Sequence, residues 1–331
     1  LVYVGVYFAV SRFGRPSPAT FAILGFTGAF VSLVTILNYF CLDPLHMLVP
    51  LREHDKNVFF STIGNRNFLC GYLCMILPVM TVLCVEETDA LLRRLLLAVV
   101  GLSFTALMAA NSDCGVLGIA VFILVFLVRY IRDIHKLKRY LLALTVMLLC
   151  ARQLGPLANL FELSRKGMGS LQVLFVYDTA GFILAVVLGL TTIGLYVLDK
   201  LKPGVILPKA VFWGLTGFLG LCLLIVAWLV LYFTVLRPDA TLSWELSFLR
   251  FNDDWGTHRG IIWRRSFDGF KAFPFWRKLL GSGPDTLYLV FQPYFPELAQ
   301  YGDTSTNAAH NEYLNYLVTV GIFGLAAYLT V

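Results

Sequence analysis

The chain has 331 residues, of which 58% are hydrophobic, 15% aromatic and only 14% charged. A soluble globular protein cannot bury that much apolar surface, and the apolar runs are long enough to cross a bilayer. The net charge of +6 follows the placement of basic residues around these runs, so it does not indicate nucleic-acid binding. We therefore expect an all-α, polytopic transmembrane helical bundle.

About nine apolar segments are candidate membrane spans. They cover residues 1–11, 19–40, 67–85, 95–111, 116–131, 139–151, 173–198, 209–236 and 313–331. The chain opens inside one apolar run and closes inside another, so we expect the natural protein to be longer. The sequence shows no internal repeat and no sign of a second domain, so residues 1–331 are predicted to form one membrane domain.

The loops between these spans fall into two alternating sets. One set of short loops carries Arg12, Arg15, Arg93, Arg94, Arg129, Arg132, Lys136, Lys138, Arg139, Lys200, Lys202 and Lys209. The other set carries Arg52, Lys56, Arg66, Arg152, Arg165 and Lys166. Because basic residues favour the cytoplasmic side, the first set is predicted to be cytoplasmic and the long loop 237–312 to lie outside.

The first polar motif is Ser61-Thr-Ile-Gly-Asn-Arg-Asn-Phe68, where an exterior loop meets a span. Asn65, Arg66 and Asn67 offer amides and a guanidinium that suit sugar hydroxyls or phosphate. The alternative is that these residues only cap the helix expected to start at Phe68.

Two acidic residues lie at the same predicted face. Asp113, in the turn Asn111-Ser-Asp-Cys-Gly115, is suited to orienting an acceptor hydroxyl, although turn formation explains it equally well. Asp178 is predicted to lie just inside the outer end of a span, where an ionisable group is a functional candidate. The alternative for Asp178 is a carboxylate bonded to Tyr177 or Thr179, or paired with an arginine.

The exterior loop is predicted to contain an amphipathic helix over residues 259–280 that ends at Gly281-Ser-Gly-Pro284. Arg259, at its start, suits an anionic group, because a guanidinium binds phosphate oxygens bidentately. Arg264 is a second substrate-binding candidate on this helix. The alternative for Arg259 is a side chain that reaches lipid headgroups.

A further helix is predicted from Asn307, with His310 in its first turn and Gly321 and Gly324 on the same face. The positive end of the helix dipole would keep the imidazole neutral, and therefore able to accept a proton. A histidine that only anchors a helix at the headgroup level is the alternative.

The spacing His310-Asn311, nine residues, Gly321, two residues, Gly324 resembles the C-terminal signature of the O-antigen ligase and polymerase superfamily. Members also carry an Arg followed four positions later by Leu or Trp and then a Gly-x-Gly turn, as in Arg259, Trp263 and Gly281 to Gly283. The Gly64-Asn65-x-Asn67 pattern before Leu77-Pro78 is similar to the early motif. Asp113 departs from the family, which often has Arg there; Arg66, Arg152 or Arg165 would then supply the charge.

The resemblance implies a membrane glycosyltransferase that moves a glycan from undecaprenyl pyrophosphate to an acceptor hydroxyl on the outer face of the cytoplasmic membrane. Arg259 would neutralise the pyrophosphate and His310, beside Asn311, would be the base. The acceptor would be a glycan, a lipid or a protein. The seven cysteines contain no Cys-x-x-Cys pair, and we predict neither a metal nor a cofactor. A polymerase of the same superfamily, a lipid-linked glycan flippase and an inactive scaffold remain alternatives.

Overall fold

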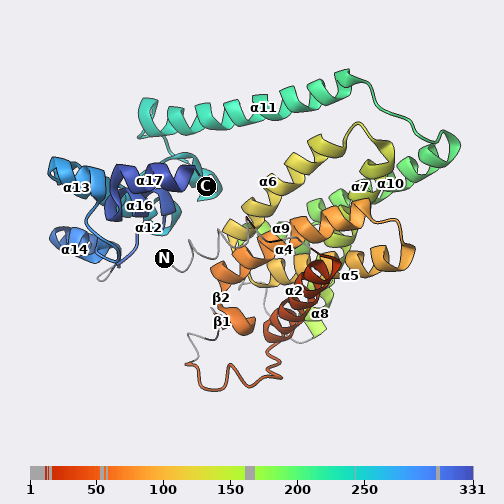
Figure 1. Ribbon diagram of the computed structural model, residues 1–331, viewed down its shortest axis with the longest axis horizontal. Coiled ribbons are helices and arrows are strands. Elements are labelled where there is room, and N and C mark those ends of the chain that lie inside the picture. The colour runs from red at the N-terminus through yellow and green to blue at the C-terminus, as the bar shows by residue number, and fades with distance from the viewer. Residues whose placement is uncertain are drawn as a thin grey trace. The chain divides into compact units, whose positions relative to one another are not determined.

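The computed structural model describes residues 12, 14, 17–52, 56, 59–160, 168–242, 244–302 and 306–330. The chain divides into two compact units, Leu1–Thr216 and Gly217–Val331, which we describe separately. Figure 1 labels most of their helices and the short hairpin of unit 1.

Unit 1 is a helical bundle with one small hairpin. Its elements are α2 (Pro18–Tyr39), β1 (Phe59–Phe60), β2 (Gly64–Asn65), α4 (Arg66–Glu86), α5 (Ala90–Ala109), α6 (Asp113–Tyr130), α7 (Ile134–Arg152), α8 (Leu154–Leu160), α9 (Ser170–Val176) and α10 (Thr179–Leu201). The strands pair antiparallel, with Phe59 opposite Asn65. Helix α11 (Lys209–Leu231) continues from unit 1 into unit 2.

Local sequence sets where several of these helices begin. Ser17 and Thr20 form a reciprocal capping box at the start of α2, which satisfies backbone donors that have no partner inside the helix. Asp89 and Asp133 accept hydrogen bonds from Leu92 N and Lys136 N, at the starts of α5 and α7. Short polar side chains therefore fix the tight turns between neighbouring helices.

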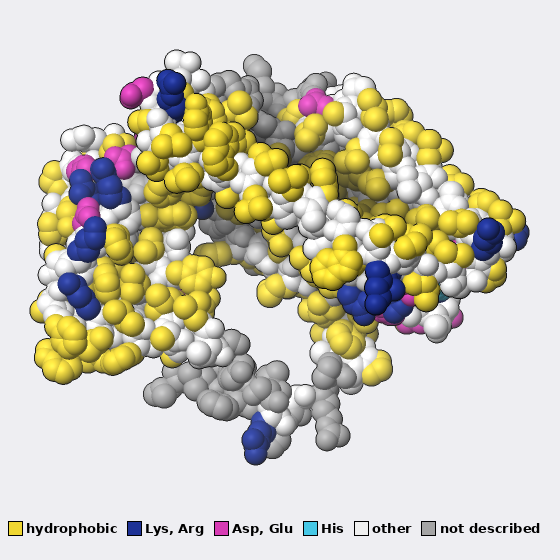
Figure 2. Space-filling view, turned by 90° about the horizontal axis from the view of Figure 1, so that it is seen from above, with side chains coloured by type: hydrophobic (Ala, Val, Ile, Leu, Met, Phe, Trp, Pro, Cys, Tyr) yellow, Lys and Arg dark blue, Asp and Glu magenta, His cyan; other side chains and the backbone are white. Residues whose placement is uncertain are grey.

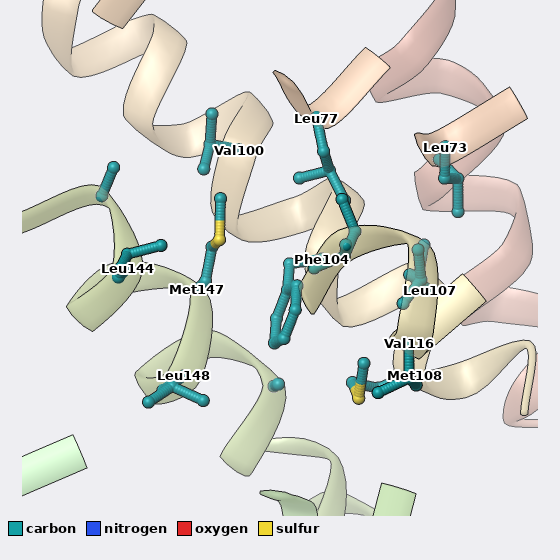
Figure 3. Packing of buried hydrophobic residues seen from close by; sticks show 14 of the residues in the cluster. Leu73, Leu77, Val100, Phe104, Leu107, Met108, Val116, Leu144, Met147 and Leu148 are labelled. Carbon is teal, nitrogen blue, oxygen red and sulfur yellow. The ribbon is translucent and has the colours of Figure 1, made fainter. Parts of the chain in front are cut away.

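The core of unit 1 lies where α4, α5 and α7 pack. Leu77, Phe104 and Met147, one from each helix, belong to one buried apolar cluster (Figure 3). Their spacing along each helix places such residues on one face, which the neighbouring helices cover.

Seven of the described helical segments are long and apolar enough to cross a membrane. They are Pro18–Tyr39, Arg66–Glu86, Ala90–Ala109, Asp113–Tyr130, Ile134–Leu160, Thr179–Leu201 and Lys209–Leu236. The predicted span 139–151 is part of the longer segment Ile134–Leu160, and the predicted span 1–11 lies outside the described residues. Apolar side chains cover most of the face drawn in Figure 2, as a lipid-facing surface requires.

Ion pairs join the helix ends that we predict to be cytoplasmic. Lys136 Nζ lies 2.6 Å from Glu86 Oε2, which links α7 to α4. Arg139 donates to the carbonyls of Val85 and Glu87 at 2.9 and 2.8 Å. Lys138 pairs with Asp199 of α10. Part of the basic set therefore also ties helices together at this end of unit 1.

Unit 2 contains short helices that follow the end of α11. They are α12 (Trp255–Ala272), α13 (Phe275–Leu280), α14 (Leu287–Phe291), α15 (Phe295–Leu298), α16 (Glu312–Thr319) and α17 (Gly321–Leu329), with single turns at Trp244–Leu249, Gln292–Tyr294 and Ala299–Tyr301. The predicted helix over 259–280 is wrong in extent. It begins at Trp255 and is interrupted at Phe273 and Pro274, because proline cannot donate the next helical hydrogen bond.

The predicted single helix from Asn307 through Gly324 is also wrong. Gly321 has a left-handed φ of 71° and separates α16 from α17. Glycine is needed there, because a Cβ on Gly321 would lie 2.3 Å from the Leu279 carbonyl oxygen. His310, Gly321 and Gly324 therefore do not share one helix face.

Candidate functional site

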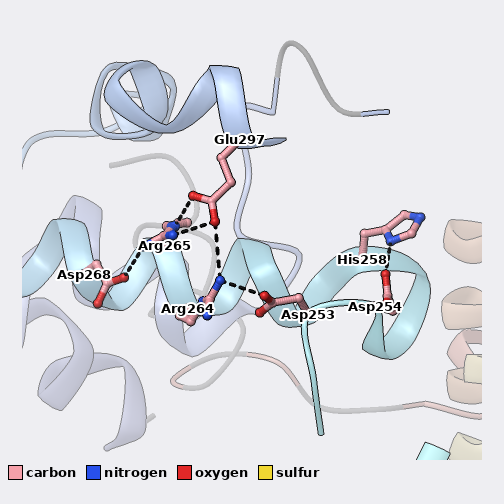
Figure 4. Close-up of polar contacts among 7 residues, drawn as sticks. All are labelled: Asp253, Asp254, His258, Arg264, Arg265, Asp268 and Glu297. Carbon is pink, nitrogen blue, oxygen red and sulfur yellow. Dashed lines mark hydrogen bonds and ion pairs between the residues drawn. The ribbon is translucent and has the colours of Figure 1, made fainter. Parts of the chain in front are cut away.

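Three arginines project from α12 in unit 2, and two of them are paired with carboxylates (Figure 4). Arg264 Nη2 lies 2.7 Å from Asp253 Oδ2 and 3.4 Å from Glu297 Oε1. Arg265 bonds Glu297 through Nε and Nη2, at 2.6 Å each, and Asp268 at 2.9 Å. These contacts join α12 to α15.

The ion pair between Arg265 and Glu297 shifts the pKa of both side chains. Its hydrogen bonds to Glu297 hold the pKa of that carboxyl below its usual range. The same hydrogen bonds raise the pKa of Arg265. Both groups are therefore charged near neutral pH, and Arg265 holds α15 against α12 rather than presenting a free cation.

The third arginine of α12, Arg259, is half-buried. Within the described part of the chain, its guanidinium makes no hydrogen bond or ion pair. Its helix turn is irregular, since Gly256 and His258 have φ values of 63° and 67°. A non-glycine residue held in this region stores strain, and such strain gathers at functional sites. Arg259 therefore offers a cation that has no partner among the described residues, as the predicted anion-binding role requires.

His310 does not lie in the first turn of a helix as predicted. It is exposed, has a left-handed φ of 49° and precedes α16 by two residues. Asn311 is the N-cap, and its Oδ1 accepts from Leu314 N at 3.2 Å. Because the Asn311 side chain caps the helix, α16 begins at Glu312 and His310 lies in a bend before it. The dipole argument for a neutral imidazole at the third helical position therefore no longer holds.

Apolar residues next to Arg259 and to His310 pack together in unit 2. Ala309, next to His310, is buried in one cluster with Ile261 and Ile262, which follow Arg259. Leu314 of α16 packs against the same cluster. Residues adjacent to both candidate catalytic side chains therefore share a core.

Two of the cavities formed by described residues of unit 2 lie near the candidate residues. One, of about 290 Å³, is lined by Phe273, Arg277, Ser282 and Tyr294 among others. The second, of about 520 Å³, lies beside the start of α12 and includes Arg264 in its lining. Neither Arg259 nor His310 lines these two cavities.

In unit 1, the early asparagine motif contacts the turn before α6. Asn65 caps α4, and its Oδ1 accepts from Asn67 N at 2.8 Å and Phe68 N at 3.4 Å. Asn65 therefore caps the helix, which begins at Arg66 and not at Phe68. Asn67 Oδ1 accepts from the Ser112 hydroxyl at 2.7 Å, which joins two motifs that are distant in sequence.

The Asn-Ser-Asp turn also holds the segment before α9. Asn111 Oδ1 accepts from Gly169 N at 2.7 Å. The Gln172 side chain is fully buried, and in the amide orientation that turns its nitrogen toward these acceptors it donates to Asp113 Oδ1 at 3.2 Å and to Gly169 O at 3.3 Å. Asp113 is itself exposed as the first residue of α6. This polar cluster lies at the end of the bundle that we predict to face outward.

Asp178 precedes the first residue of α10 and does not lie inside a span. Helix α9 ends at Val176, and Arg152 Nη1 donates to the carbonyls of Phe175 and Asp178 at 3.3 and 3.0 Å. The predicted depth was wrong because the chain turns here between two helices. Arg165 lies outside the described residues.

Sequence reasoning did not select Asp253, Glu297 or Gln172. Glu297 becomes a partner of Arg264 only when α15 packs against α12, and Asp253 only when the segment before α12 folds back along that helix. No spacing in the chain predicts these contacts. Gln172 is the third residue of the apolar helix α9, where one polar residue gives little signal.

Within the described residues, seven helical segments that are long and apolar enough to cross a membrane define a polytopic helical membrane protein. Residues 167–329, about half of the chain, match the O-antigen ligase family. The protein belongs to the O-antigen ligase superfamily of glycosyltransferase-like membrane enzymes. The match includes Asp178, Arg259, Arg264, His310 and Asn311. Asn65, Arg66, Asn67, Asp113 and Arg165 lie before it.

Neither the comparison with curated proteins nor the comparison with solved structures gave a match.

Proposed function

We propose that this protein transfers a glycan from an undecaprenyl pyrophosphate donor to an acceptor hydroxyl at the outer face of the cytoplasmic membrane. The membership of residues 167–329 in the O-antigen ligase family supports a lipid-linked glycan as the substrate. The basic residues of the short loops support the outward orientation of unit 2.

The main support for this proposal is the difference in pairing among the three arginines of α12. Arg264 and Arg265 are engaged by carboxylates, whereas Arg259 has no acceptor among the described residues. A half-buried guanidinium with unused donors suits a pyrophosphate, which it can bind bidentately. The charge that develops on the departing pyrophosphate is the charge that such a group stabilises.

His310 is the proposed general base. The acceptor oxygen forms a bond to the anomeric carbon of the donor sugar, and the bond from that carbon to the pyrophosphate oxygen breaks. The acceptor proton passes to the imidazole, and the electron pair leaves with the lipid pyrophosphate. Histidine suits this step because it exchanges protons near neutral pH. Its exposure in unit 2 leaves room for an acceptor.

In unit 1, Arg66, Asn67 and Asp113 are proposed to bind the glycan or its phosphate. Asn67 and Asp113 are held by Ser112 and Gln172, and the remaining lone pairs of Asp113 are exposed. Asn65, Arg165, Asp178 and Asn311 stay in the proposed substrate-binding set as flanking polar groups.

The test uses the purified protein in liposomes with a radiolabelled undecaprenyl-pyrophosphate glycan. Lipid A core, a second lipid-linked oligosaccharide and a serine-containing peptide are supplied as separate acceptors, each with and without excess EDTA. We expect label on one acceptor in both conditions, and that acceptor distinguishes a ligase from a polymerase. Label that crosses the bilayer without reaching any acceptor would identify a flippase and contradict the proposal.

A further inference from the structure

The larger cavity of unit 2 has an aromatic wall. Phe251, Trp263 and Phe267 line it, and the rings of Phe251 and Trp263 lie 5.8 Å apart at an interplanar angle of 32°. Trp255 packs against both, at 5.4 and 5.3 Å. Phe251 and Phe267 are nevertheless 40% and 45% exposed. Lys271 Nζ lies over the Phe267 ring, 4.5 Å from its centroid. The exposed parts of these rings, with Phe251 supported by Trp255, are suited to a flat apolar partner.

The rim of the same cavity is polar. Asn252, Asp253 and Arg264 line it, and Figure 4 shows Asp253 and Arg264 turned toward each other beside α12. Their ion pair uses Arg264 Nη2 and Asp253 Oδ2. Within the described part of the chain, Arg264 Nε and Nη1 and Asp253 Oδ1 make no hydrogen bond. The pair thus holds donors and an acceptor in fixed positions while leaving them available.

The charges on and next to this rim are balanced, with Lys271 beside the Phe267 ring as a further cation. Arg264 faces Asp253 and Glu297, and Arg265 is bound by Glu297 and Asp268. A phosphate or uronate would meet carboxylates as well as guanidinium groups, and like charges disfavour binding. The cavity therefore favours an uncharged ligand with hydroxyl groups around an apolar face.

We infer that this cavity is a subsite for a neutral hexose ring of the transferred glycan or of the acceptor. The ring's C–H face stacks on Phe267 and Phe251, and its hydroxyls bond Asp253, Asn252 and Arg264. The volume of about 520 Å³ lies in the range of small-molecule sites. The inference rests on the proposed function, because it names a substrate group that this enzyme would bind.

The test measures saccharide binding directly. Full-length protein in lipid nanodiscs is titrated with the methyl glycosides of glucose, galactose, mannose and rhamnose, and binding is followed by saturation-transfer NMR. We expect at least one glycoside to bind the wild type. Phe267→Ala should raise its Kd about fivefold or more, because stacking is lost. Phe267→Tyr keeps the ring and should bind within about twofold of wild type.

Phe275→Ala on α13 is the matched control, because Phe275 is also exposed, at 66%, and does not line the cavity. It should bind like the wild type. Absence of binding for all four glycosides, or an unchanged Kd for Phe267→Ala, would overturn the inference.

Transfer assays on the same variants separate the two proposals and the two sources of the sugar. A raised KM for the donor assigns the hexose to the donor glycan, and a raised KM for the acceptor assigns it to the acceptor. Wild-type transfer together with unchanged binding in Phe267→Ala would reject the subsite and keep the transferase. Specific glycoside binding with no transfer to any acceptor would reject the transferase and keep the saccharide site.

Discussion

The carboxylate of Glu297 receives two hydrogen bonds from Arg265, one from Nε and one from Nη2, at 2.6 Å each. This fork joins α15 to α12 across 32 positions of sequence. Since α12 also carries Arg259, the pair fixes the helix on which the proposed anion-binding side chain lies.

Glu297→Gln should lower the thermal stability of the protein at pH 7. The pKa of Glu297 is lowered in the folded state. The pair therefore stabilises the fold at pH values above the pKa of a glutamate in the unfolded chain, which is about 4.3. That contribution disappears as the pH falls through the lower, folded pKa. We expect the difference in Tm between wild type and variant to be largest near neutral pH and to shrink below about pH 4. A difference in Tm that stays constant down to pH 3 would contradict the assignment.

Gly321→Ala should destabilise unit 2 strongly. The new Cβ would meet the Leu279 carbonyl oxygen at 2.3 Å, and the residue would keep a left-handed φ. We expect a loss of about 2 kcal/mol or more, measured as a fall in Tm. Gly214→Ala in α11 is the control, because nothing lies within 4 Å of a Cβ there. Equal Tm values for the two variants would show that the glycine contact is unimportant.

The hydrogen bond from Ser112 to Asn67 predicts energetic coupling between two motifs of unit 1. In a double-mutant cycle with Ser112→Ala and Asn67→Ala, we expect a coupling free energy of about 1 kcal/mol. The transfer rate should fall in both single variants if this cluster holds the substrate. A cycle of Ser103→Ala with Asn67→Ala is the control and should be additive, because Ser103 bonds Ser32 in the buried core and not Asn67. Additive free energies together with wild-type transfer rates would rule out this role.

Arg259→Lys tests whether the guanidinium binds phosphate or reaches lipid headgroups. Lysine keeps the charge and loses the planar fork, so we expect the KM for the donor to rise roughly tenfold or more. Arg277→Lys, on an exposed position of α13, should leave that KM unchanged. A normal KM for Arg259→Lys would favour the lipid-anchoring alternative.

Much of the bundle follows from the sequence, because long apolar runs dictate spans. Five predicted segments, from 19–40 through 139–151, correspond to or fall within described helices, as do 173–198 in part and 209–236. The errors came from local backbone chemistry. Pro274 divided one predicted helix and Gly321 another, while Asn311 capped α16 and left His310 outside it.

The contacts of the candidate site were less predictable. The partners of Arg264 and the link between Asn67 and Ser112 depend on how helices pack. Periodicity identifies which residues share a face of one helix, but it does not say which side chain of another helix they will meet.

The most direct test of the account is the transfer rate of His310→Ala at saturating donor and acceptor, with donor binding measured on the same preparation. We expect the rate to fall by about a hundredfold or more, because the base is lost, while the donor binds as it does to the wild type. A transfer rate equal to that of the wild type would contradict the proposed mechanism.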